Sequence, residues 1–120
     1  MNINPVTAKK FYNDQMDEQK LLKDNSNFIT LSDRKKIIKK AIDMKFDIII
    51  FDDGLQEKWI DYDIKFACFD SEKWIGNGHL IPSGPLREKI NTIKNYHGIF
   101  LKTVNENSNI DYIFNRIRNI

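Results

Sequence analysis

The run FDIIIFDDGLQ, residues 46–56, constrains the fold of this chain more than any other segment. Its first half is β-branched or aromatic, and it is too short and too continuous for an amphipathic helix, so it predicts a β-strand. Apolar residues on both faces of a strand are typical of a parallel sheet covered by helices on each side. The run ends at Asp52, Asp53 and Gly54, which are poor strand formers and favour a turn. We therefore expect a buried parallel strand followed by two carboxylates.

The position of these two carboxylates suggests a site. Ligands of open α/β sheets bind beyond the carboxyl ends of the strands. Two carboxylates share such a place at low cost only when a cation or a proton lies between them. An apolar strand that ends in aspartate is also how P-loop nucleotide-binding proteins hold magnesium. Two other interpretations stay open. Asp52 and Asp53 could simply form the turn, or one could be the nucleophile of a hydrolase, although such enzymes usually place their carboxylates on alternate residues.

The remaining elements follow from residue patterns along the chain. Residues 1–15 are polar and weakly patterned, and Ser32 is the expected N-cap of a helix with apolar residues on one face and lysines on the other. Ser83-Gly84-Pro85 predicts the start of a further helix. The expected order is helix 14–23, strand 27–31, helix 33–44, strand 46–51, buried strand 64–70, loop 71–83, helix 86–95, strand 98–104, turn 105–109 and helix 110–120. This alternation predicts an α/β fold with a mostly parallel sheet and no domain boundary.

Composition limits the classes of protein to consider. The chain has 120 residues, 41% hydrophobic and 30% charged, which fits one soluble domain with a modest core. A net charge of +2 gives no support for nucleic-acid binding. No segment approaches the roughly 20 apolar residues of a membrane span. The single cysteine, Cys68, cannot form a disulfide within the chain, which agrees with a reducing, intracellular setting.

The segment WIGNGHLIPSGPLRE, residues 74–88, is the second unusual stretch. Its glycines leave backbone amides accessible, and a helix N-terminus after it would attract anions. Arg87, in the first turn of that expected helix, opposes the helix dipole, which makes sense if it reaches a phosphate or a carboxylate. The alternative is a surface Ω-loop in which Arg87 forms a salt bridge.

Two smaller features have simple alternatives. The acidic pair Asp17-Glu18 is what an exposed helix start normally carries, because carboxylates favour the positive end of the dipole. Arg34, in the run SDRKK, taken alone belongs to a solvated basic helix face. No G-x-x-x-x-G-K-[ST] pattern occurs in the chain, so the sequence has no recognisable phosphate cradle of its own.

Both motifs together, DDGLQ at residues 52–56 and GNGHLIPSGPLRE at residues 76–88, resemble those of the tetraacyldisaccharide 4'-kinases, the lipid A 4'-kinases of Gram-negative bacteria. The order and spacing of the motifs agree with that family, over about residues 11–104. The resemblance implies a P-loop NTPase-like core, with helices on both faces of the sheet in three layers. It implies an enzyme that moves the γ-phosphate of ATP to the 4' hydroxyl of a lipid disaccharide 1-phosphate, with Mg²⁺ as cofactor, at the cytoplasmic face of the inner membrane.

The resemblance also implies roles for acidic residues. Asp17 matches the aspartate that helps to activate the hydroxyl, and Glu18 matches its neighbour near the metal. Asp52 and Asp53 match the pair that carries magnesium and its waters. Gln56 lies in the same motif.

Arg34 and Arg87 match arginines that face phosphates of the nucleotide or the lipid. These roles suit phosphoryl transfer, which depends mostly on positioning and on neutralising charge.

The chain departs from the family pattern at three residues. Met16 replaces a glycine, Gln19 replaces a proline, and Glu57 replaces the histidine that commonly follows the DDGxQ pattern. The family's membrane helix and P-loop precede, and its second lobe follows, the segment that this sequence matches. We therefore expect residues 1–120 to be a single, partial kinase core domain that is inactive when isolated. The alternatives are a non-catalytic module that binds an anion or nucleotide, and the product of a decayed gene.

Overall fold

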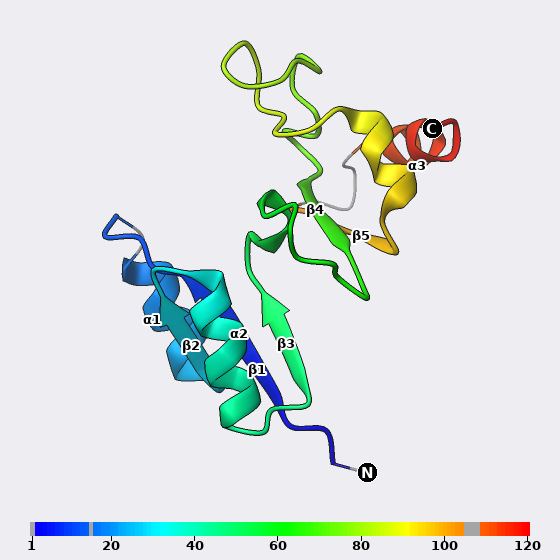
Figure 1. Ribbon diagram of the computed structural model, residues 1–120. Helices are drawn as coiled ribbons and strands as arrows, with labels where there is room; N and C mark the ends of the chain where they lie inside the picture. Colours follow the sequence, from blue (N-terminus) through cyan, green and yellow to red (C-terminus); the bar gives the residue numbers. More distant parts are fainter. Residues whose placement is uncertain (1, 15, 105–108) are drawn as a thin grey trace. The chain divides into compact units, whose positions relative to one another are not determined.

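The computed structural model describes residues 2–14, 16–104 and 109–120, so most of the turn expected at residues 105–109 lies outside the described part. Contacts divide the chain into two compact units, Met1–Ile60 and Asp61–Ile120 (Figure 1). The single domain expected from the sequence stays a prediction. Both units are α/β, with parallel strands flanked by helices, as predicted.

The first unit is a three-stranded parallel sheet in the order β2-β1-β3 with two α-helices. Its elements are β1 (Pro5–Lys10), α1 (Met16–Asn25), β2 (Phe28–Leu31), α2 (Arg34–Asp43), β3 (Ile48–Phe51) and the short 3-10 helix η1 (Gly54–Gln56). The predicted helix near residues 14–23 and the strand near 27–31 are confirmed. The N-cap of α2 is Asp33 rather than Ser32, since the Asp33 carboxylate accepts a hydrogen bond from the backbone N–H of Lys35.

The central strand of this sheet is β1, which the sequence did not predict. Its side chains alternate between two covered faces. Val6 and Ala8 lie on one face, where they pack with Ile37 and Ala41 of α2. The side chain of Lys9 points to the other face and contacts Glu18 of α1. The two helices therefore cover opposite faces of the sheet, which gives the three layers expected (Figure 1).

The prediction that the strand ending at Phe51 is buried on both faces is wrong. Strand β3 lies at an edge of the three-stranded sheet, and only Ile49 and Phe51 pack against the core. Ile48 and Ile50 face the other way and are 44% and 55% exposed. The apolar run does form a strand, but β1 rather than β3 lies between two neighbouring strands.

The second unit contains a parallel pair of strands, β4 (Phe66–Asp70) and β5 (Gly98–Lys102), the 3-10 helix η2 (Ile90–Asn95) and α3 (Ile110–Arg118). The strands near residues 64–70 and 98–104 and the last helix are thus confirmed. Strand β4 is not buried throughout, since Phe66 is 48% exposed.

The helix predicted for residues 86–95 is wrong. Leu86 forms an isolated parallel bridge with Leu80, and a backbone hydrogen bond joins the Ile81 N–H to the Leu86 carbonyl. These bonds hold the chain extended after Pro85, so the helical turn begins only at Ile90 and is of the 3-10 type.

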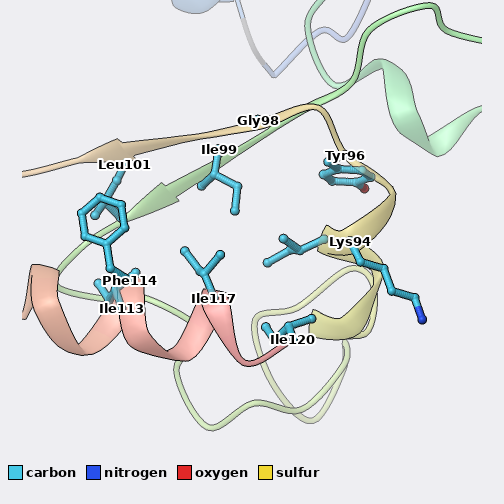
Figure 2. Close-up of a pocket in the computed structure, with 10 residues that line it drawn as sticks. Lys94, Tyr96, Gly98, Ile99, Leu101, Ile113, Phe114, Ile117 and Ile120 are labelled. Atoms are coloured by element: carbon cyan, nitrogen blue, oxygen red, sulfur yellow. The ribbon is translucent and has the colours of Figure 1, made fainter.

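An apolar groove of about 430 Å³ lies between β5 and α3 in the second unit. Figure 2 shows Ile99 and Leu101 of β5 facing Ile113 and Ile117 of α3. Tyr96 lies at the end of this groove. Burial, together with the hydrogen bond that its hydroxyl donates to Glu88, raises the pKa of Tyr96 to about 12.

The core of the first unit gives a direct stability test. Ile37 is fully buried, whereas Ile42 on the same helix is 66% exposed. We expect Ile37→Ala to lower the free energy of unfolding by about 2–5 kcal/mol, because it removes buried methyl groups and leaves a cavity. Ile42→Ala should change it by less than about 0.5 kcal/mol. Urea titrations followed by circular dichroism measure both values, and equal effects would contradict this core.

Candidate active site

A cluster of charged side chains lies at the carboxyl end of the sheet in the first unit, around Lys9. The Lys9 side chain is only 2% exposed. Its ammonium group donates hydrogen bonds to Glu18 Oε2 and, at 2.7 Å, to Asp52 Oδ2. The two carboxylates remain open to solvent, with side chains 64% and 45% exposed. A buried cation thus lies beneath two accessible acids.

Strand register brings these three residues together. Ala8 pairs with Phe51, and the Asp52 N–H donates to the Ala8 carbonyl, so Asp52 continues the ladder beside Lys9. Paired residues of parallel strands point to the same face. That face is the one covered by α1, whose first turn carries Glu18. Sequence reasoning missed Lys9 because a lysine near polar residues reads as solvated. The alternation of apolar Val6 and Ala8 was the available signal.

Two effects act on the charge of Lys9 in opposite directions. Burial disfavours the ammonium form, but the hydrogen bonds to Asp52 and Glu18 and their negative charges outweigh it. The pKa of Lys9 therefore lies above its ordinary value of 10.5. Lys9 is a permanent cation at neutral pH.

Arg34 fixes the turn that follows β3. Its side chain is 2% exposed, and its guanidinium donates to Glu57 Oε1 at 2.8 Å and to the Asp53 carbonyl at 2.7 Å. Asp53 has a left-handed backbone, with φ 53° and ψ 32°, a conformation that aspartate tolerates better than most residues. Arg34 thereby separates the two adjacent aspartates, since it binds the backbone of Asp53 while Lys9 binds the side chain of Asp52.

Glu57 gives Arg34 its anionic partner, at a position where the resemblance implies a histidine. The Trp59 indole N–H, which donates to Glu57 at 2.9 Å, and the Arg34 guanidinium keep the pKa of Glu57 below its ordinary value of 4.5. Glu57 is therefore ionised at neutral pH, and the departure from the family pattern has a local structural reason.

The other predicted residues of the first unit are accessible. Asp17 is exposed in the first turn of α1, and Gln56 is exposed at the end of η1. Their proposed roles stay predictions. Gln19, at a position where the resemblance implies a proline, is buried, and its amide donates to the Tyr12 carbonyl at 2.8 Å.

In the second unit, Arg87 lies exposed on the extended segment after Pro85. The helix-dipole argument for Arg87 therefore does not apply. The preceding loop is held by Asn77, whose amide donates to the Ser83 carbonyl at 2.8 Å and whose oxygen accepts from the His79 N–H at 3.1 Å. Asp70 lies at the end of β4, and its carboxylate accepts hydrogen bonds from the backbone N–H groups of Glu72 and Lys73. These bonds lower the pKa of Asp70.

The arrangement around Asp52 does not fit a divalent ion between Asp52 and Glu18. The Lys9 ammonium already lies between their nearest oxygens. Within the described parts of the chain, no group of three or more histidine, cysteine, aspartate or glutamate residues could hold a metal ion. Magnesium binding by Asp52 and Asp53 stays a prediction.

Comparison with known proteins supplies the family. The profile of the family described as tetraacyldisaccharide-1-P 4'-kinase matches residues 3–117. The chain is 48% identical over 100 residues to a tetraacyldisaccharide 4'-kinase of Pelagibacter ubique, a match that covers 83% of this chain and 32% of that enzyme. It is 36% identical over 81 residues to the enzyme of Vibrio vulnificus, with 66% of this chain and 24% of that enzyme covered.

The chain belongs to the tetraacyldisaccharide 4'-kinase family. It spans about a third of the length of the Pelagibacter ubique relative. No solved structure matches the chain. Among the helices in the described residues, none is long and apolar enough to cross a membrane.

The Arg34–Glu57 pair of this family member predicts a dependence of stability on pH. Because the folded-state pKa of Glu57 is depressed, its contribution is present above pH 4.5 and is lost as the pH falls through the lower, folded-state value. Glu57→Gln should therefore lower the Tm at pH 7, and the Tm values of variant and parent should converge towards pH 3. Thermal melts across this range measure the convergence. Glu72→Gln, at an exposed carboxylate, is the control, and an equal Tm difference at every pH would contradict the prediction.

Gly84 tests the loop of the second motif. A Cβ at this position would come nearer to Asn77 Oδ1 and to the His79 backbone than real Cβ contacts allow. We expect Gly84→Ala to break the hydrogen bond from the Leu86 N–H to the His79 carbonyl and to speed exchange of that amide proton. Hydrogen exchange followed by NMR reads this amide directly. Ser83→Ala, at an exposed neighbour, should leave it unchanged, and unchanged exchange in both variants would refute the role of Gly84.

Proposed function

We propose that this chain forms part of the α/β core of a kinase that transfers the γ-phosphate of ATP to the 4' hydroxyl of a tetraacyldisaccharide 1-phosphate in lipid A biosynthesis. Membership of the family supports the reaction class. The observation that carries the local assignment is the cluster of Lys9, Glu18 and Asp52 with Arg34, gathered beyond the carboxyl ends of parallel strands. This is where α/β proteins bind nucleotides and their substrates.

In the proposed reaction, the 4' oxygen forms a bond to the γ-phosphorus while the bond from that phosphorus to the bridging oxygen of ADP breaks. Asp17 is the residue proposed to take the proton of the hydroxyl, with Glu18 beside it on α1. Both acids lie on the first turn of a helix and are exposed, so a substrate can reach them. Asp52 and Asp53 are the residues proposed to face the magnesium that accompanies ATP.

The proposed phosphate contacts come from Gln56, Arg34 and Arg87. Arg34 has two of its nitrogens engaged with Glu57 and the Asp53 carbonyl, so its main effect within the proposal is to hold the turn. Arg87 is exposed, in keeping with a contact to a ligand. Action at the cytoplasmic face of the inner membrane belongs to the same proposal.

The chain alone should not catalyse transfer. It contains no phosphate cradle and lysine of the P-loop kind, so no bound nucleotide would be positioned for attack. Transfer requires the parts of the family enzyme that this chain does not match.

A chimaera of the Pelagibacter ubique kinase tests the proposal. Its 100-residue matching segment is replaced by that of this chain. We expect the purified chimaera to transfer radiolabelled phosphate from ATP to tetraacyldisaccharide 1-phosphate, and Asp52→Asn to reduce the rate by about 100-fold, because a charged group near the transferred phosphoryl is lost. Asp61→Asn, at an exposed acid, is the matched control.

A folded but inactive chimaera, or full activity of its Asp52→Asn variant, would refute the proposed function. Residues 1–120 alone are assayed beside it and should show no transfer. Turnover by the pure chain that Asp53→Ala abolishes would overturn the expectation of inactivity.

A further inference from the structure

Glu18 and Asp52 provide a position for one cation, and the protein fills it with its own side chain. The nearest oxygens of the two carboxylates both accept from the same ammonium nitrogen, that of Lys9. The lysine side chain is 98% buried from solvent, while both carboxylates are accessible. The ammonium lies on the face of the sheet that α1 covers, between the two acids.

We propose that Lys9 is a positioning residue that takes the place of a divalent cation between Glu18 and Asp52 and thereby keeps metal ions from this pair. The geometry supports this assignment because a metal ion that bridged the two carboxylates would have to occupy the position of the Lys9 nitrogen. Two positive ions cannot share that position.

Burial makes Lys9 hard to displace. If a metal ion took both carboxylates, the ammonium would stay inside the unit without a partner, and an unpaired buried charge is strongly unfavourable. Magnesium would gain little in exchange. It needs near-octahedral oxygen coordination, and the described residues bring only two carboxylates to this point. The ion pair is therefore favoured over the metal complex.

For the kinase reaction the consequence is a division of roles, and this part rests on the proposed function. Lys9 takes the position between Glu18 and Asp52, so the metal that accompanies ATP does not bridge this pair and instead faces Asp53 and the Asp52 oxygen that Lys9 does not bind. Lys9 touches neither reactant, so it acts through the two acids that it holds in place. The exclusion of metal by Lys9 stands on the ion pairs alone.

Binding of Mn²⁺, used as a spectroscopic probe for Mg²⁺, tests the proposal on residues 1–120. Free Mn²⁺ is measured by electron paramagnetic resonance during titration of the parent and of Lys9→Met, whose folding is checked by circular dichroism. We expect Lys9→Met to bind one Mn²⁺ at least about tenfold more tightly than the parent, which corresponds to about 1.4 kcal/mol. Adding Glu18→Gln to Lys9→Met should restore the weak affinity of the parent.

Two further variants separate the position of Lys9 from its charge in general. Lys10→Met removes a positive charge from the adjacent residue, which lies over the Tyr12 ring instead of between the acids, and should change the Kd for Mn²⁺ less than about twofold. Lys9→Arg keeps a cation at the site and should keep the weak affinity. Equal tightening by Lys9→Met and Lys10→Met would overturn the proposal.

Glu18→Gln in the parent background decides the question even if Lys9→Met does not fold. Since Glu18 binds lysine and not metal in this proposal, the Kd for Mn²⁺ should be unchanged. A tenfold loss of affinity would show that Glu18 is a metal ligand and would refute the role of Lys9. Because the readout is metal binding, failure of phosphoryl transfer in the chimaera would leave this result intact, and the reverse also holds.

Discussion

The buried ammonium of Lys9 is the constraint on which the first unit depends. A charge at the end of a central strand has no access to bulk water, so it must be neutralised by groups that the fold brings to it. One acid comes from the first turn of α1 and the other from the residue after β3. The same contacts that satisfy Lys9 therefore fix a helix and a strand end to β1. These ion pairs gather the charged side chains at the carboxyl end of the sheet.

Arg34 is a second buried cation, and it binds the backbone of the turn that follows β3. It begins α2, where a positive charge opposes the helix dipole, and it is almost fully buried. Glu57 and the Asp53 carbonyl compensate for both disadvantages. Two buried cations from different elements thus hold successive residues of the DDGLQ motif, one through a side chain and one through a carbonyl. Lys9 and Arg34 bind the motif from its buried side, and Asp52 and Asp53 remain accessible to solvent.

Residue patterns predicted much of the fold because most elements show their period clearly. The amphipathic stripe of α2 and the apolar strands β3 and β5 could be found from sequence alone. Strand β1 is harder to find, because its six residues include two lysines and only the alternation of Val6 and Ala8 marks it as a covered strand. The apolar content of β3 predicts an interior strand, although an interior position depends on which strand has two neighbours. The helix predicted after Pro85 is wrong for a similar reason. The bridge between Leu80 and Leu86 keeps this segment extended, and local helix propensity cannot predict such a contact.

The site was predictable to the level of residue identity and not to the level of partners. Adjacent aspartates need a cation or a proton, or they simply form the turn, and the family resemblance implied magnesium. Strand β4 ends in Asp70 and strand β3 is followed directly by Asp52, yet the two aspartates have different partners. Asp70 caps its own turn by accepting backbone hydrogen bonds, which is the role that the sequence analysis left open for Asp52 and Asp53. Asp52 instead accepts a hydrogen bond from the ammonium group of Lys9, which lies beside it on β1. Each aspartate has a lysine beside it on the neighbouring strand, since Asp70 pairs with Lys102. What distinguishes them is that Lys9 is buried on a central strand whereas Lys102 is exposed, and this burial is fixed by sheet order rather than by any pattern along the chain. A motif match therefore identifies Asp52 and Glu18 as candidate site residues. Their cationic partner, Lys9, becomes visible only in the folded structure.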